Sequence, residues 1–214
     1  GLQVEKNLIR GFMGITGSKS DELGIDAKKS IRRRLLISFI AVIVISVGVL
    51  DSLLIYFVKQ HFYKNVEAVL TNQIKISADF YNRYFSNTPL EYNVLDNVDV
   101  FWKQTTAQVQ IINLDGKILL DSIGVLNKET VESSDFKRAL KGEKGTWIGS
   151  VEYDNAQIMA VSYPLKSDEK IVGVIRFITS LREVDGEVTN IALVFLAIGT
   201  IVVFSVIVVS LFIA

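Results

Sequence analysis

The sequence predicts an α+β domain held between two membrane-spanning helices. Two apolar runs, Leu35–Val58 and Ile191–Ala214, each contain 24 residues. At 1.5 Å of rise per residue, such a run is long enough to cross a bilayer core of about 30 Å. Between the runs the apolar pattern changes from helical spacing to strict alternation, which is typical of a helix followed by a β-sheet.

The charges next to the first run predict how the chain is oriented. Residues 1–34 contain eight Lys and Arg against four Asp and Glu, whereas residues 59–190 contain 15 and 18. Because cytoplasmic flanks carry the excess of Lys and Arg, we expect a cytoplasmic N-terminus at the plasma membrane. The first run is longer than the apolar core of a signal peptide and lacks a small-residue cleavage site after it, which favours an uncleaved anchor.

Four segments follow from this topology. We expect a cytoplasmic segment (1–34), a first span (35–58), an extracellular domain (59–190) and a second span (191–214). Because the second apolar run reaches the last residue, we expect the sequence to be a fragment whose cytoplasmic output domains follow Ala214.

Composition excludes several classes of function. The chain has no Cys and a single His, so the usual zinc and thiol sites are not expected. The net charge is zero and no basic stripe lies between the spans, so nucleic acid is not an expected partner. About 130 exported residues are enough for one domain stabilised by its apolar core alone. No cofactor and no metal are expected.

The first exported segment, Lys59–Tyr84, is predicted to be a helix that continues the first span. It contains neither Gly nor Pro. Leu70 and Ile74 form one apolar edge of this helix. A second set recurs at alternating four- and three-residue spacings, which is the pattern of a two-stranded helical seam: Phe62, Val66, Val69, Gln73, Ile76 and Phe80. Two interpretations stay open: one amphipathic helix packed on a sheet, or a seam between two copies in a homodimer.

The remainder of the exported domain is predicted to be a sheet of about five antiparallel strands. Asp115-Gly116 is a hairpin signal between the first two strands, and a short helix follows them at Ser133–Lys141, with Ser134 or Asp135 as N-cap. The expected strands are 108–113, 117–122, 146–153, 157–165 and 171–179.

Four stretches of this region carry a resemblance to a known family. They are VQIINLDGKILLDS, DFKRALKGEKGTW, MAVSYPL and IVGVIRFITSL. Together they resemble the extracytoplasmic PAS-like (single Cache) sensor domain of bacterial sensor histidine kinases, most closely the phosphate-sensor and cell-wall-sensor kinases of Gram-positive bacteria. The resemblance implies a dimerisation helix at Lys59–Tyr84, and a relay and kinase module beyond Ala214 that would act on a response regulator. Residues 1–26 depart from the family pattern, and no function is assigned to them.

The same resemblance implies a ligand pocket on the sheet face under the short helix. Its candidate wall residues are Arg138, Trp147, Tyr153, Tyr163 and Arg176, and the basic ones among them suit a small anion. The alternative is that the aromatic residues belong to the core and the basic residues to the surface, in which case the domain would bind a protein partner.

Two further residues stand out because of their position. Asp51 lies inside the first span, roughly 7 Å from its centre, where a carboxyl is either a polar contact between the spans of two copies in a dimer, or a snorkelling or neutral group near the interface. His61 follows the first span and lacks the acidic neighbour and downstream Pro of a kinase phosphoacceptor site. No catalytic constellation is present: the acidic pairs and the Ser133-Ser134 pair lack an oriented partner.

Three functions follow as hypotheses. The first is the sensory and transmembrane part of a homodimeric sensor histidine kinase that detects an extracellular cue. The second is a membrane-anchored binding protein without a signalling output. The third is the sensor region of a chemoreceptor or a diguanylate cyclase.

Overall fold

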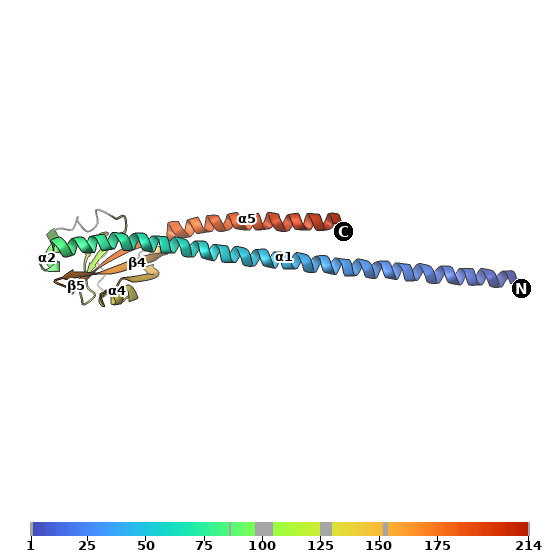
Figure 1. The fold of residues 1–214 in the computed structure, drawn as a ribbon, viewed down its shortest axis with the longest axis horizontal. Helices are drawn as coiled ribbons and strands as arrows, with labels where there is room; N and C mark the ends of the chain where they lie inside the picture. Colours follow the sequence, from blue (N-terminus) through green and yellow to red (C-terminus); the bar gives the residue numbers. More distant parts are fainter. Residues whose placement is uncertain (1, 86, 97–104, 125–129, 152–153, 214) are drawn as a thin grey trace. The chain divides into compact units, whose positions relative to one another are not determined.

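The computed structural model describes residues 2–85, 87–96, 105–124, 130–151 and 154–213, and Figure 1 draws their helices and strands. The chain divides into two compact units. One unit is Tyr56–Asn190, and the other combines Gly1–Ile55 with Ile191–Ala214.

The first helix is continuous from the apolar run into the α+β domain. Helix α1 runs over Leu2–Tyr84. The stretch between Gly48 and Pro89 contains no Gly or Pro that would break it. The short helix α2, Leu90–Asp96, was not predicted. It begins directly after Pro89, and the Asn93 side chain closes the turn by donating hydrogen bonds to the carbonyls of Phe85 and Thr88.

A five-stranded antiparallel sheet follows, as predicted. The strands are ordered β2-β1-β5-β4-β3, so the first hairpin pairs with the last strand. All four pairings are antiparallel. The bounds of the strands are β1 Gln108–Ile112, β2 Ile118–Asp121, β3 Gly145–Val151, β4 Asp154–Ser167 and β5 Lys170–Ser180.

The short helix between β2 and β3 also forms, but its predicted N-cap was wrong. Helix α4 spans Ser134–Ala139 and its N-cap is Ser133, one residue before the expected position. Ser133 makes no side-chain capping bond. Asp135 cannot serve as the cap because its carboxylate accepts hydrogen bonds from Arg176 and Ser162.

The two faces of the sheet are covered by different helices, as Figure 1 shows. The face toward α1 carries the larger apolar cluster, in which Leu70, Ile74 and Tyr81 pack on Ile111, Phe177 and other buried strand residues. The opposite face holds a smaller cluster where α4 packs through Phe136 and Ala139. Strand alternation separates the two sets, because successive side chains point to opposite faces.

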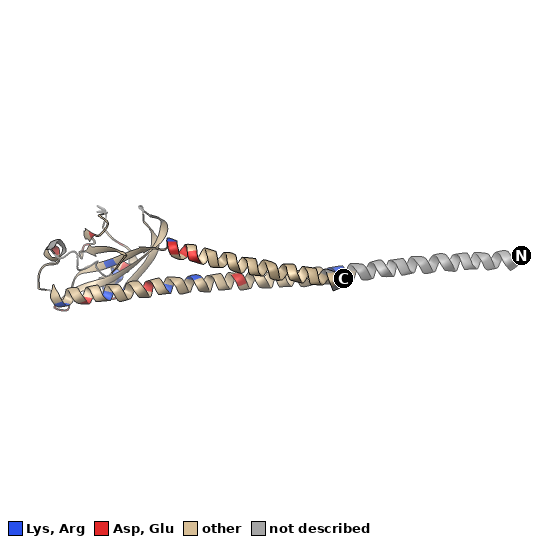
Figure 2. Cartoon of the chain, turned by 90° about the horizontal axis from the view of Figure 1, so that it is seen from above, with Lys and Arg blue, Asp and Glu red and all other residues tan. Residues whose placement is uncertain are grey.

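The last helix, α5, spans Arg182–Ile213 and joins both units. Its acidic residues lie at its start, and Figure 2 shows no charge farther along. Both α1 and α5 are long and apolar enough to cross a membrane. The most apolar stretch of α1 is 0% buried within the chain, and that of α5 is 6% buried. Apolar helices exposed to this degree suit lipid better than water.

Candidate functional site

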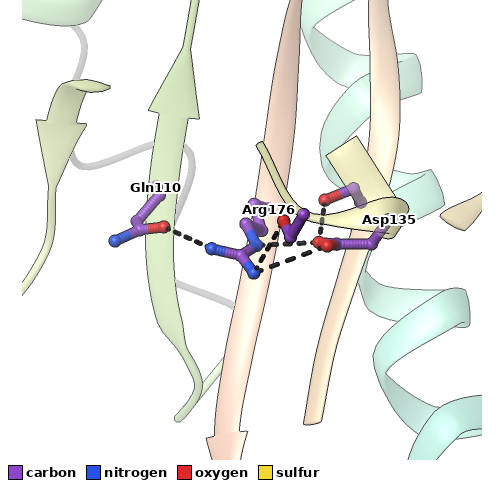
Figure 3. Close-up of polar contacts among 5 residues, drawn as sticks. Gln110, Asp135 and Arg176 are labelled. Carbon is purple, nitrogen blue, oxygen red and sulfur yellow. Dashed lines mark hydrogen bonds and ion pairs between the residues drawn. The ribbon is translucent and has the colours of Figure 1, made fainter. Parts of the chain in front are cut away.

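A buried ion pair lies on the sheet face under α4. The Arg176 side chain on β5 is 8% exposed and the Asp135 side chain on α4 is fully buried. Arg176 Nε donates to Asp135 Oδ2 at 2.8 Å, and the Ser162 hydroxyl on β4 donates to the same oxygen at 2.7 Å (Figure 3). Three elements that are distant in sequence therefore meet at one carboxylate.

The network extends across the sheet toward its β2 edge. Arg176 Nη1 donates to Gln110 Oε1 at 3.4 Å, a contact marked by a dashed line in Figure 3. Gln110 Nε2 in turn donates to Asp121 at 2.8 Å. Gln108 also donates to Asp121, whose carboxylate in addition accepts the backbone N–H of Ile123. The largely buried row thus begins with the Asp135–Arg176 ion pair and continues through the Gln110 amide to the Asp121 carboxylate.

The contacts that Arg176 already makes limit its ability to bind an external anion. The guanidinium already has an anionic partner, because Asp135 accepts from Nε and the Ser133 hydroxyl lies 3.3 Å from Nη2. An external carboxylate or phosphate would therefore compete with Asp135. The competition is unfavourable to the ligand, since a displaced Asp135 would lose its cation inside the domain.

The structure brings together only some of the residues that the sequence proposed for a pocket. The Trp147 ring lies 5.7 Å from the Arg176 guanidinium carbon, and it packs against Ile158, Ala160 and Ile178. Tyr163 lies on the opposite face and packs with the α1 cluster.

The two remaining candidates lie elsewhere. Arg138 is exposed and pairs with Glu143 at 3.2 Å. Tyr153 lies outside the described residues.

Sequence reasoning missed Asp135, Gln110 and Ser162 as members of the site. A signal for two of them exists in the strand pattern. Gln110 and Ser162 fall on alternation positions whose neighbours are buried, and both are themselves buried. A polar residue at a buried position requires a hydrogen-bond partner, so such positions mark a polar network in advance. Asp135 gave no comparable signal because helix N-termini commonly carry Asp.

The outer face of α1 keeps an apolar stripe exposed. Among the predicted seam residues, Val69, Ile76 and Phe80 are 48%, 53% and 40% exposed. Val66 instead packs against the domain core, and Gln73 accepts a hydrogen bond from Thr105. Phe62 is half-buried. The helix therefore packs on the sheet through one edge and leaves the other edge exposed.

A polar cluster connects α1, α5 and β4 at the end of the domain next to the spans. The Tyr63 hydroxyl donates to Asp185 Oδ1 at 2.9 Å, and Lys59 Nζ lies 3.3 Å from the same oxygen. Gln157 Oε1 lies 3.3 Å from the Tyr63 hydroxyl. Burial, followed by the bond to Asp185, raises the pKa of Tyr63, so its hydroxyl stays protonated and able to donate.

Asp51 lies where α1 and α5 meet within the other unit. Gly199 on α5 is buried, and a Cβ placed on it would be 2.8 Å from Asp51 Oδ2 and 2.9 Å from a Val47 methyl. The carboxyl is thus seated against the backbone of Gly199. Within the described ranges, no cluster of three or more His, Asp and Glu side chains is arranged to hold a metal ion.

No protein-family model and no curated protein matches the chain. Several solved structures do. The ligand-binding domain of the Campylobacter jejuni chemoreceptor Tlp3 with L-norvaline matches at 16% identity and a TM-score of 0.49, over 67% of this chain and 61% of that one. The Escherichia coli DcuS sensor domain matches at 15% identity and a TM-score of 0.44, over 57% and 96%. The sensor domain of the Vibrio cholerae histidine kinase DctB matches at 20% identity and a TM-score of 0.32, over 54% of this chain and 42% of that one.

This chain therefore covers less than two thirds of the Tlp3 domain. Identities of 15–20% and TM-scores below 0.5 leave the function to be argued from the residues of this chain.

Proposed function

We propose that this chain is the sensory and transmembrane part of a membrane-bound signal receptor. Residues 59–190 would form a PAS-like (single Cache) sensor domain outside the plasma membrane. The observation that carries the proposal is the continuity of α1, which contains the apolar run and also the edge that packs on the sheet. A change in how the sheet holds α1 would then reach the bilayer without an intervening loop.

The more specific proposal is a two-component sensor histidine kinase. Its relay and kinase domains would follow Ala214 and would act on a response regulator. Sequencing the gene beyond Ala214 tests this. A basic relay stretch followed by a helix with His-Glu and a downstream Pro supports the kinase. A methyl-accepting or cyclase domain supports a chemoreceptor or a diguanylate cyclase. A stop codon within a few residues supports an anchored binding protein.

The orientation is testable without a known ligand. The chain has no Cys, so a single introduced thiol can be labelled without interference. Tyr92 is 67% exposed in the sensor domain. We expect Tyr92→Cys to react with a membrane-impermeant maleimide in intact cells, and Ser18→Cys to react only after lysis. The opposite labelling pattern would refute the orientation.

The cue that this domain detects would be a protein partner or a small anion. The buried Arg176–Asp135 pair favours the protein partner, because an anion would have to displace a fully buried carboxylate. Isothermal titration with acetate, citrate and inorganic phosphate tests the anion. Binding that is lost in the double variant Asp135→Leu with Arg176→Met, which removes both charges together and is expected to keep the fold, would favour the anion over a protein.

A homodimer through the exposed stripe of α1 is also proposed. The stripe of Val69, Ile76 and Phe80 is apolar and continues a seam spacing typical of two-stranded helices. We expect Val69→Cys and Ile76→Cys to cross-link between copies in membranes. Lys75→Cys is the matched control, since it is exposed but lies about 100° around the helix from Ile76. Equal cross-linking at all three positions would argue against the seam.

A further inference from the structure

Two contacts hold α5 against α1, one in each unit. The first, which we name the membrane-proximal clasp, consists of Lys59, Tyr63 and Asp185. The Tyr63 hydroxyl and the Lys59 ammonium both bind the same Asp185 oxygen. The second, which we name the glycine seat, consists of Asp51 and Val47 against Gly199.

The clasp is anchored to the sheet from both sides. Leu181, one residue before α5, is fully buried in the main core, and its N–H donates to the carbonyl of Gln157 on β4. The Gln157 side chain also lies 3.3 Å from the Tyr63 hydroxyl. On the α1 side, the side chains of Tyr63 and Val66 pack against the same core. Asp185 therefore cannot shift along α1 without disturbing the end of the sheet.

Inside the apolar parts of the two helices, the glycine seat also resists sliding of α5 along α1. Gly199 is buried, and no side chain there holds the Asp51 carboxyl away from the α5 backbone. One turn away on the same face of α5 lie Phe195 and Val203, both half-buried. A slide of one helical turn, about 5.4 Å, would bring the carboxyl against one of these larger side chains. Close packing at a small residue is a common way to fix two helices in a membrane.

We infer that the clasp and the glycine seat lock the axial register of α1 and α5 within one chain, so that a signal passes as a joint movement of both helices. This rests on the proposed function, because it describes how that receptor would transmit its cue. The two contacts block the sliding of one helix past the other by one turn, which is a known type of conformational switch. Tilt or rotation of the pair as one body keeps both contacts intact.

Cysteine pairs in the full chain in native membranes test the register. The contacts of Gly199 with Val47 and Asp51 place Ile43 opposite Val206, because antiparallel helices advance in opposite directions. The in-register pair is Ile43→Cys with Val206→Cys. The pair one turn out of register is Ile43→Cys with Ser210→Cys. Each is oxidised briefly, and the intrachain disulfide is measured by its altered mobility after proteolysis between the helices.

In the parent chain we expect the in-register pair to form at least tenfold faster than the other. Tyr63→Phe combined with Asp185→Asn should reduce this ratio severalfold, and so should Gly199→Val alone. Tyr84→Phe is the matched control, since it makes the same chemical change at a side chain that is 67% exposed, and it should leave the ratio unchanged. A similar rate for both pairs in the parent chain, or an unchanged ratio in either variant, would overturn the inference.

The outcome does not depend on the signalling role. The disulfide forms within one chain, so the measurement gives the same answer for a monomer, a homodimer or an anchored binding protein. Continued formation of the in-register pair shows that a variant has folded. Failure of the register lock and failure of the receptor proposal are therefore separate results.

Discussion

Removing either partner of the buried Arg176–Asp135 pair should strongly destabilise the α+β domain. Asp135 is fully buried and accepts hydrogen bonds from Arg176 and Ser162. Asp135→Ala would leave a buried guanidinium without its anion, which costs about 3–5 kcal/mol. Arg176→Met would leave the carboxylate with the Ser162 hydroxyl as its remaining side-chain donor, and we expect a cost in the same range, about 3–5 kcal/mol.

The double variant separates an ion-pair effect from a packing effect. Asp135→Leu with Arg176→Met replaces both charges with apolar groups, which is often close to neutral for a buried pair. We therefore expect the double variant to cost no more than either single change, which corresponds to a coupling of at least about 3 kcal/mol. The surface pair of Arg138 and Glu143 is the control, and Arg138→Gln should cost less than about 1 kcal/mol.

Urea unfolding of the full chain in detergent, followed by tryptophan fluorescence, measures these differences. Trp147 lies beside Arg176, so its emission reports on this part of the sheet. Single variants that each cost less than about 1 kcal/mol, or a double variant that costs the sum of the two, would refute the view that the pair acts as one buried unit.

Three further predictions concern α1 and the start of β3. The hydrogen bond from the Lys144 ammonium lowers the pKa of Glu67. This contact therefore stabilises the fold at pH values above the ordinary carboxyl pKa, and the stabilisation is lost as the pH falls through the lowered pKa. We expect Glu67→Gln to flatten the acid side of a plot of unfolding free energy against pH. Gly145→Ala should cost more than about 2 kcal/mol in urea unfolding, because its Cβ would overlap the backbone of Asp135; an unchanged midpoint would contradict this. Thr71 Oγ1 is buried and has no partner among the described residues, so Thr71→Val should be neutral or stabilising by up to about 1 kcal/mol, and a loss of thermal stability would show that the hydroxyl is satisfied.

Elements with a strong local pattern could be predicted from the sequence. The helix over 59–84 and all five strands were recovered with bounds shifted by at most a few residues, because their apolar periods and turn signals are local properties. The short helix α2 was missed, since seven residues carry too little pattern to reveal a helix. The N-cap of α4 was misplaced because Asp135 is used by Arg176, which is distant in sequence.

The candidate site was less predictable than the fold. The family resemblance proposed Arg176 for the sheet face under the short helix, where it lies, but its partner depends on how α4 is set over that face. Likewise, the stripe on α1 was visible in the sequence, but not which of its residues would pack on the sheet. Val66 and Gln73 turned out to contact their own domain, whereas Val69 and Ile76 are exposed.

The sequence alone was enough to establish two apolar helices of spanning length, an α+β domain between them, and a chain without Cys. These properties depend on composition and on periods shorter than one element. The pairing of Arg176 with Asp135, and the contacts of Tyr63 with Asp185 and of Asp51 with Gly199 between α1 and α5, became visible in the folded chain. Such contacts join residues that are far apart along the chain, and their geometry is set by the packing of whole elements rather than by any local pattern.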